Sequence, residues 1–141
     1  MYDKDRFIWE VTNEAIALRE NATRDELNKL SLAVLNPMTE YGCIYGQMTG
    51  SCFSEKASDL IVQCCPRYFR SYAVTQYNHF GNVINNANGT KVVNFKNARK
   101  KSSKEDRHFS AIEVYITLPN AKLKNLVSYL RKETDKLDLY F

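Results

Sequence analysis

The spacing of apolar residues changes at Pro66, and this change constrains the fold more than any other feature of the chain. Before Pro66, apolar residues recur every three or four positions, as they do on the buried face of a helix. This spacing predicts three helices, over residues 3–19, residues 23–36 and residues 55–65. Thr23 and Glu26 have the spacing of a capping box at the start of the second helix, and Ser54 is the expected N-cap of the third.

The second half of the chain is rich in Tyr, Phe, Val and Ile and shows the two-residue period of strands. Asn88-Gly89 lies between two such runs and predicts a hairpin turn, because these residues adopt positive φ readily. Residues 108–118 alternate strictly between two faces and predict a strand, whereas the spacing of residues 123–130 predicts a final helix. We therefore expect an α+β fold with N-terminal helices, an antiparallel sheet of about three to four strands and a C-terminal helix.

Length and composition are those of one compact domain over residues 1–141, since 44% of the residues are hydrophobic. The first residues include acidic groups and no apolar run, so we expect neither a secretory signal nor a transit peptide. No apolar stretch approaches the roughly 20 residues that span a bilayer. We therefore expect a cytoplasmic protein with no membrane partner, in which the four cysteines stay reduced.

Residues 96–108 form a basic segment with six basic and two acidic side chains. Between two predicted strands, such a segment is expected to be a long, exposed connection, and the simplest interpretation is a solvated loop. The alternative is an arm that binds nucleic acid, because clustered basic groups release counterions from phosphates. The charge would come from Arg99, Lys100, Lys101 and Lys104. Aromatic residues that stack on bases are not interleaved with them, which favours the loop.

All four cysteines lie between Cys43 and Cys65, and a metal site would have to be built there. Structural zinc is typically bound by ligands two to four residues apart. Here eight residues separate Cys43 from Cys52, eleven more precede Cys64, and Cys65 follows directly. This spacing favours cysteines that act as small buried hydrophobic residues, so we expect no metal and no cofactor. A zinc site would have to use Cys43, Cys52 and Cys64 with a histidine as the fourth ligand.

Cys52 is the candidate nucleophile of the chain. It lies shortly before the third predicted helix, where the helix dipole would lower the pKa of a thiol. A cysteine hydrolase also needs a histidine base, and His79 and His108 lie in no recognisable signature. The acidic residues are scattered over predicted helix surfaces, which is atypical of paired-carboxylate hydrolases. The sequence therefore favours a protein that is not an enzyme, with hydrolysis through Cys52 and His79 as the least favoured function.

The segment from Gly46 to Ser54 carries two glycines and three hydroxyl groups in front of the third predicted helix. Glycine-bearing turns at such places bind anions through backbone amides. The candidate ligand-binding residues are Gly46, Thr49, Gly50, Ser51 and Ser54. Three residues lie between the two glycines, where a P-loop has four, and no Gly-Lys-Ser/Thr follows, so the segment is not a P-loop. The alternative is a tight connection in which Ser54 only caps the helix.

The chain also carries the string Cys43-x-Tyr45-Gly46-Gln47-x-Thr49-Gly50-x-Cys52-x-Ser54, the run Ala111-Ile-Glu-Val-Tyr-Ile-x-Leu-Pro and the run Leu126-x-x-Tyr129-Leu130. In these parts, which cover about a third of the chain, it resembles small, uncharacterised accessory proteins encoded by tailed bacteriophages. The resemblance implies a host-takeover or anti-defence factor that acts by binding in the host cytoplasm. It implies no catalytic residues.

These observations together predict a non-enzymatic binding protein that sequesters or inhibits a host component. Its expected ligand is phosphorylated, either a nucleotide signal or nucleic acid, and is bound at the glycine segment with charge from residues 96–108. The alternative is a protein-interaction module that inhibits a host protein directly through helix faces and aromatic side chains. Both functions are compatible with a homo-oligomer.

Overall fold

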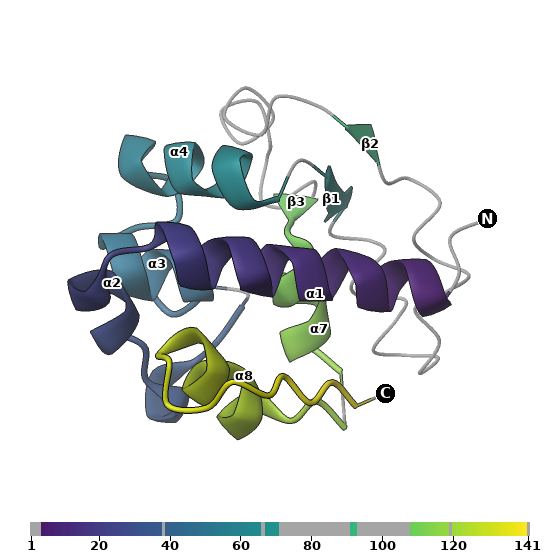
Figure 1. Cartoon of the computed structure of the whole chain (residues 1–141). Coiled ribbons are helices and arrows are strands. Elements are labelled where there is room, and N and C mark those ends of the chain that lie inside the picture. Colours follow the sequence, from purple (N-terminus) through teal and green to yellow (C-terminus); the bar gives the residue numbers. More distant parts are fainter. Residues whose placement is uncertain are drawn as a thin grey trace.

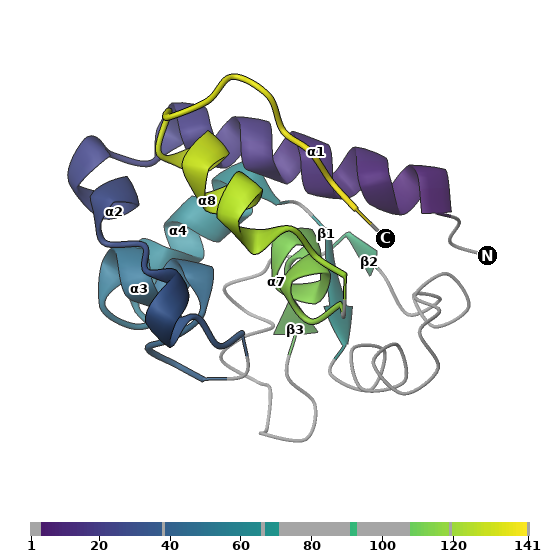
Figure 2. The ribbon, with the colours of Figure 1, turned by 90° about the horizontal axis from the view of Figure 1, so that it is seen from below.

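The structure, a computed structural model, describes residues 4–37, 39–65, 67–70, 91–92, 108–118 and 120–140. Its longest helix, α1 (Lys4–Asn21), packs against α4 (Glu55–Cys64), α7 (Ala111–Ile116) and α8 (Leu123–Leu130). Figure 1 shows α4 and α8 on opposite sides of α1, and Figure 2 shows the same bundle from below. The short helices α2 (Arg24–Asn28) and α3 (Ile44–Thr49) lie near the C-terminal end of α1.

The inner stripe of α1 confirms the helix predicted for residues 3–19. Phe7, Val11, Ala15 and Leu18 are fully buried. Because they are three or four residues apart, they fall on one side of the helix and form the centre of the core. The final helix is also confirmed, since α8 spans residues 123–130.

Two predicted helix starts are confirmed by their caps. At the start of α2, the Glu26 amide donates to Thr23 Oγ1 at 3.1 Å, and the Thr23 amide donates to the Glu26 carboxylate at 2.8 Å. At the start of α4, the Ala57 amide donates to Ser54 Oγ at 3.1 Å. Each bond satisfies a backbone amide that the helix itself leaves without a partner.

The predicted α+β fold class is wrong, because the described part of the protein is mostly helical and has no sheet large enough to form a layer. Residues 111–116, inside the predicted strand 108–118, form α7, and the strand is reduced to β3 (His108–Phe109). Alternation in this run does not separate a buried from an exposed face, since all the side chains of α7 are buried. Ser110 and Glu113 start the helix as a capping box, with hydrogen bonds of 3.0 and 3.2 Å.

In the part of the chain that the structure describes, the expected sheet of three to four strands is reduced to three short strands. They are β1 (Arg67–Arg70), β2 (Lys91–Val92) and β3. They pair antiparallel in the order β2-β1-β3, with Arg67 opposite Val92 and Phe69 opposite Phe109. With two to four residues each, they form a short ladder beside α7 rather than a layer that covers the helices.

The helix predicted for residues 23–36 is shorter than expected. α2 ends at Asn28, and a 3₁₀ turn, η1 (Leu32–Val34), follows it. The Gln47 side chain from α3 accounts for the interruption, because it donates to the Ser31 carbonyl at 3.1 Å and accepts from the Ser31 amide at 2.7 Å. These two bonds hold Ser31 in an extended conformation (φ −138°, ψ 122°), in which a helix cannot continue.

Some sequence predictions fall outside the described residues. These are the turn at Asn88-Gly89, the candidate base His79 and the basic residues Arg99, Lys100, Lys101 and Lys104. Within the described ranges, no helix is long and apolar enough to cross a membrane. The cytoplasmic location stays a prediction.

Candidate functional site

The segment predicted to bind an anion as a glycine-bearing turn forms α3 and the turn after it. Cys43 is the N-cap of α3, and its Sγ accepts a hydrogen bond from the Gly46 amide at 3.3 Å. Glycine is required at position 46, since a Cβ atom there would collide with the Glu40 carbonyl oxygen. Gly50 ends the helix in the left-handed conformation (φ 94°), and its amide donates to the Gly46 carbonyl at 2.9 Å. The helix therefore uses these two glycine amides itself.

The structure does bring the predicted ligand-binding residues of this segment together. They are Gly46, Thr49, Gly50, Ser51 and Ser54. Their hydroxyl groups, however, bond within the protein: Thr49 Oγ1 donates to the Tyr45 carbonyl at 2.7 Å, and Ser51 Oγ donates to the Glu40 carboxylate at 2.6 Å. A phosphate group at this segment would have to displace bonds that already satisfy these donors.

All four cysteines are free and buried, which confirms the prediction that they pack as small hydrophobic residues. A hydrogen bond to Cys52, together with burial, raises the pKa of the Cys43 thiol. Burial and the nearby Glu14 carboxyl raise the pKa of Cys64 to about 12, and burial raises that of Cys65 well above its usual value. At neutral pH these three thiols hold their protons, and the thiol is the unreactive form of cysteine.

The residues proposed for hydrolysis and for metal binding do not assemble into a site within the described ranges. Cys52 is fully buried, and His79 lies outside those ranges. Among the described His, Cys, Asp and Glu side chains, no three are arranged to hold a metal ion. Cys43, Cys52 and Cys64 therefore do not form a ligand set in this part of the chain.

A buried carboxyl group that the sequence analysis did not single out joins α1 to α7. Glu14 accepts hydrogen bonds from the Tyr45 hydroxyl, from the Ile112 amide at 2.8 Å and from the Ser110 side chain. Burial raises the pKa of Glu14 to about 7, although these hydrogen bonds act in the opposite direction. Glu14 can therefore take up a proton near neutral pH, but it is enclosed by the core and bears on stability rather than on catalysis.

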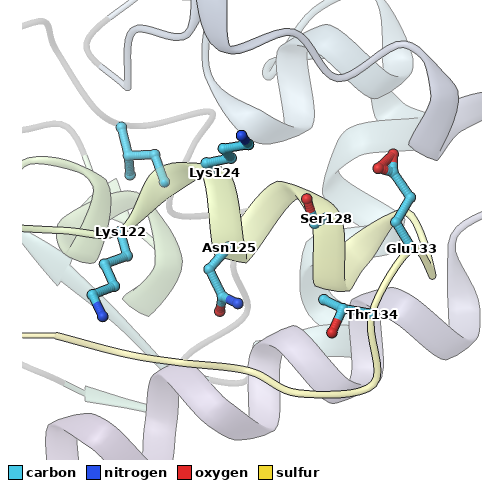
Figure 3. A pocket seen from close by; sticks show the side chains of 7 residues that line it. Lys122, Lys124, Asn125, Ser128, Glu133 and Thr134 are labelled. Carbon is cyan, nitrogen blue, oxygen red and sulfur yellow. The ribbon is translucent and has the colours of Figure 1, made fainter.

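The outer face of α8 carries a pocket of about 550 Å³ (Figure 3). Its lining comes from α8 and from the turn that follows it, and consists of Lys122, Leu123, Lys124, Asn125, Ser128, Glu133 and Thr134. Lys122 and Asn125 point to the side of the helix along which the last described residues run, whereas Lys124 and Ser128 point to the other side. The pocket therefore borders a stretch of the protein's own chain.

The outer face of α1 carries two exposed apolar side chains. Trp9 is 62% exposed, and Ile16, seven residues later, is 39% exposed. Seven residues are close to two helical turns, so both side chains lie on the same face, opposite the buried stripe. The sequence signal for this face lies in the same helical spacing that predicts the buried side of α1.

No family model, curated protein or solved structure matches the chain. The resemblance to phage accessory proteins therefore remains an expectation from sequence. What the protein does has to be inferred from its own surfaces, chiefly the outer faces of α1 and α8.

Proposed function

We propose that the chain is a non-enzymatic binding protein that docks on a partner protein through the outer face of α1. The observation that carries the proposal is the position of the one tryptophan of the chain, which stands exposed on the longest helix with Ile16 two turns away. In the setting of a tailed phage, the partner is a host protein that this contact inhibits.

Trp9 is suited to such a contact on energetic grounds. Tryptophan is enriched among the residues that dominate binding, where a single truncation weakens a complex by about 2 kcal/mol or more. The helix already holds Trp9 in place, and Asn13 Nδ2 donates to the Trp9 carbonyl at 2.8 Å, so little backbone order remains to be gained on binding. Asn13 and Glu20 are exposed on the same face and supply the polar border that interfaces usually have.

We prefer binding of a partner protein at the outer face of α1 to binding of the phosphorylated ligand that the sequence predicts. The amides of Gly46 and Gly50 and the hydroxyls of Thr49 and Ser51 are bonded within the protein, so the glycine segment offers no ready cradle for a phosphate. The exposed apolar pair on α1, by contrast, has no other described role.

Trp9 also provides the test, because it is the one tryptophan of the chain and the indole emission therefore reports on this position alone. Three forms of the protein are used to capture partners from cells of its host. They are the parent, a Trp9→Ala Ile16→Ser variant, and a Tyr41→Ala control. Tyr41 is a matched control, since it is 68% exposed but belongs to a different part of the fold. We expect a host protein that the parent and the control retain and the α1 variant loses.

The captured protein is then purified and titrated into the parent protein. Burial of the indole should shift the Trp9 emission to shorter wavelength, and Ile16→Ser should weaken the binding at least tenfold. The proposal is overturned if the α1 variant captures the same proteins as the Tyr41→Ala control, or if the purified partner leaves the emission unchanged.

A further inference from the structure

Residues 134–140, which we call the strap, follow α8 and run back between α8 and α1 (Figures 1 and 2). The strap contains no helix or strand. Arg19 on α1 fixes its beginning: the guanidinium donates to the Thr134 carbonyl and to the Asp135 carboxylate, both at 2.7 Å. The strap is thus an extended peptide that lies on the folded helices.

Side chains of the bundle bind the backbone of the strap. Asn125 donates to the Lys136 carbonyl at 3.3 Å and accepts from the Asp138 amide. The Tyr115 hydroxyl accepts from the Tyr140 amide at 3.3 Å. Backbone contacts of this kind hold an extended segment whatever its sequence, and they are the basis of many peptide-binding sites.

Other contacts depend on the side chains of the strap. Leu137 and Leu139 are partly buried and pack against the core. Between them, Asp138 forms an ion pair with Lys122 at 2.7 Å, and the Lys122 ammonium also lies 5.2 Å from the centre of the Tyr140 ring. We call the surface that contacts the strap, which includes Arg19, Tyr115, Lys122 and Asn125, the groove. Along the strap, this surface contacts an apolar, an acidic, an apolar and an aromatic residue in succession.

The contacts that hold the strap on the bundle are weaker than the contacts that hold the helices together. The Lys122–Asp138 and Arg19–Asp135 pairs are exposed on at least one side, and exposed ion pairs contribute little to stability. Segments with few buried contacts open at a lower free energy than the core does. Beside the strap, the pocket of about 550 Å³ leaves room on α8 for further side chains of a bound segment.

We propose that the groove formed by Arg19, Tyr115, Lys122 and Asn125 is a docking site for an extended segment of a partner protein with the pattern apolar–acidic–apolar–aromatic. The strap is its resident occupant and competes with that segment. This proposal does not depend on the outer face of α1, which is a separate surface of the bundle.

The competition between the strap and a free peptide can be measured as a change in the apparent affinity of the peptide. A tethered segment has an effective concentration in the millimolar range. If the strap and a free peptide of the same sequence both bind with an intrinsic dissociation constant near 10 μM, the strap occupies the groove in about 99% of the molecules. The apparent affinity of the free peptide then falls by roughly a hundredfold. Releasing the strap should therefore tighten the binding of a free peptide by at least tenfold.

The experiment uses a fluorescent peptide with the sequence of residues 134–140, titrated with full-chain protein and followed by anisotropy. The strap is released by Leu137→Ser and Leu139→Ser, with Val62→Ser, an exposed apolar position on α4, as the matched control. We expect the released variant to bind the peptide at least tenfold more tightly than the parent and the control. Asn125→Ala in the released variant should remove this gain, and so should a peptide with lysine at the position that corresponds to Asp138.

If the doubly substituted chain does not fold, Asp138→Ala alone serves as a milder release, because it breaks the contact with Lys122 and leaves both leucines in place. Equal peptide affinity in parent and released proteins would overturn the proposal, and so would full binding in the Asn125→Ala variant. A parent protein that elutes as a dimer and becomes a monomer on release would also overturn it, because the groove would then take the strap of a second copy.

Discussion

At the scale of single residues, the most specific prediction concerns the effect of Glu14 on how stability depends on pH. The pKa of its carboxyl rises from 4.5 to about 7 on folding, so the charged form is disfavoured in the folded state. The contribution of this group to stability is therefore fully present below about pH 4.5 and is lost as the pH rises through about 7, by an amount on the order of 3 kcal/mol. Glu14→Gln cannot ionise and should not show this loss.

The measurement is the free energy of unfolding in urea, determined for the parent and for Glu14→Gln at pH 5 and at pH 8. The difference between the two proteins isolates Glu14 from the other titrating groups. We expect the difference to move in favour of the variant as the pH rises. A difference that is the same at both pH values would show that Glu14 ionises normally in the core.

The residues of the candidate surfaces were only partly accessible to sequence analysis. The spacing of Cys43, Cys52 and Cys64 does not suit a metal site, and from this spacing the sequence predicted that they are buried, as the structure shows. Asn125 gave no signal, since its role depends on a segment more than ten residues away that folds back onto it. Gly46 has a structural role that the sequence did not indicate, since a Cβ atom at this position would collide with the Glu40 carbonyl oxygen.

At the scale of elements, the end of α8 carries a prediction about backbone strain. The Glu133 amide donates to the Ser128 carbonyl at 2.8 Å and the Lys132 amide to the Tyr129 carbonyl at 3.1 Å, which is a Schellman motif. Lys132 adopts a φ of 62° there, a conformation that favours glycine. Lys132→Gly should stabilise the protein by about 1 kcal/mol and raise the melting temperature by roughly 3 °C.

Arg131→Gly is the matched control, because Arg131 has a φ of −80° and gains nothing from glycine. It should lower the melting temperature, since glycine adds entropy to the unfolded chain. Calorimetry on the two variants separates strain relief from a general effect of glycine near a helix end. Equal shifts in the two variants would contradict the assignment of strain to Lys132.

The helices that the sequence predicted correctly are those with one face exposed to solvent. α1, α4 and α8 have an exposed side, so their apolar residues show the helical period. α7 has none, and its β-branched Ile112, Val114 and Ile116 gave the run the composition of a strand. The capping box of Ser110 and Glu113 was visible in the sequence, and it would have indicated the helix. For residues 29–36, the deciding contact with Gln47 comes from another element and has no local signal.

At the scale of the whole molecule, the strap should open without unfolding the bundle. Arg19 connects the two, since its guanidinium donates to the carbonyls of Tyr129 and Thr134 at 3.1 and 2.7 Å and pairs with Asp135. Lysine keeps the charge but cannot reach three acceptors in one plane. Arg19→Lys should therefore raise the fraction of open strap at least tenfold, while the packing of α1 on α4 and α7 stays intact.

Limited digestion with trypsin measures this opening. Lys136 lies in the strap, and Lys56, exposed on α4, provides an internal control in the same molecule. When opening and closing are fast, the cleavage rate follows the population of the open form, so cleavage after Lys136 should accelerate at least tenfold in Arg19→Lys and cleavage after Lys56 should not change. If both sites accelerate together, the strap and the bundle unfold as one unit, and the groove cannot exchange its occupant independently of the fold.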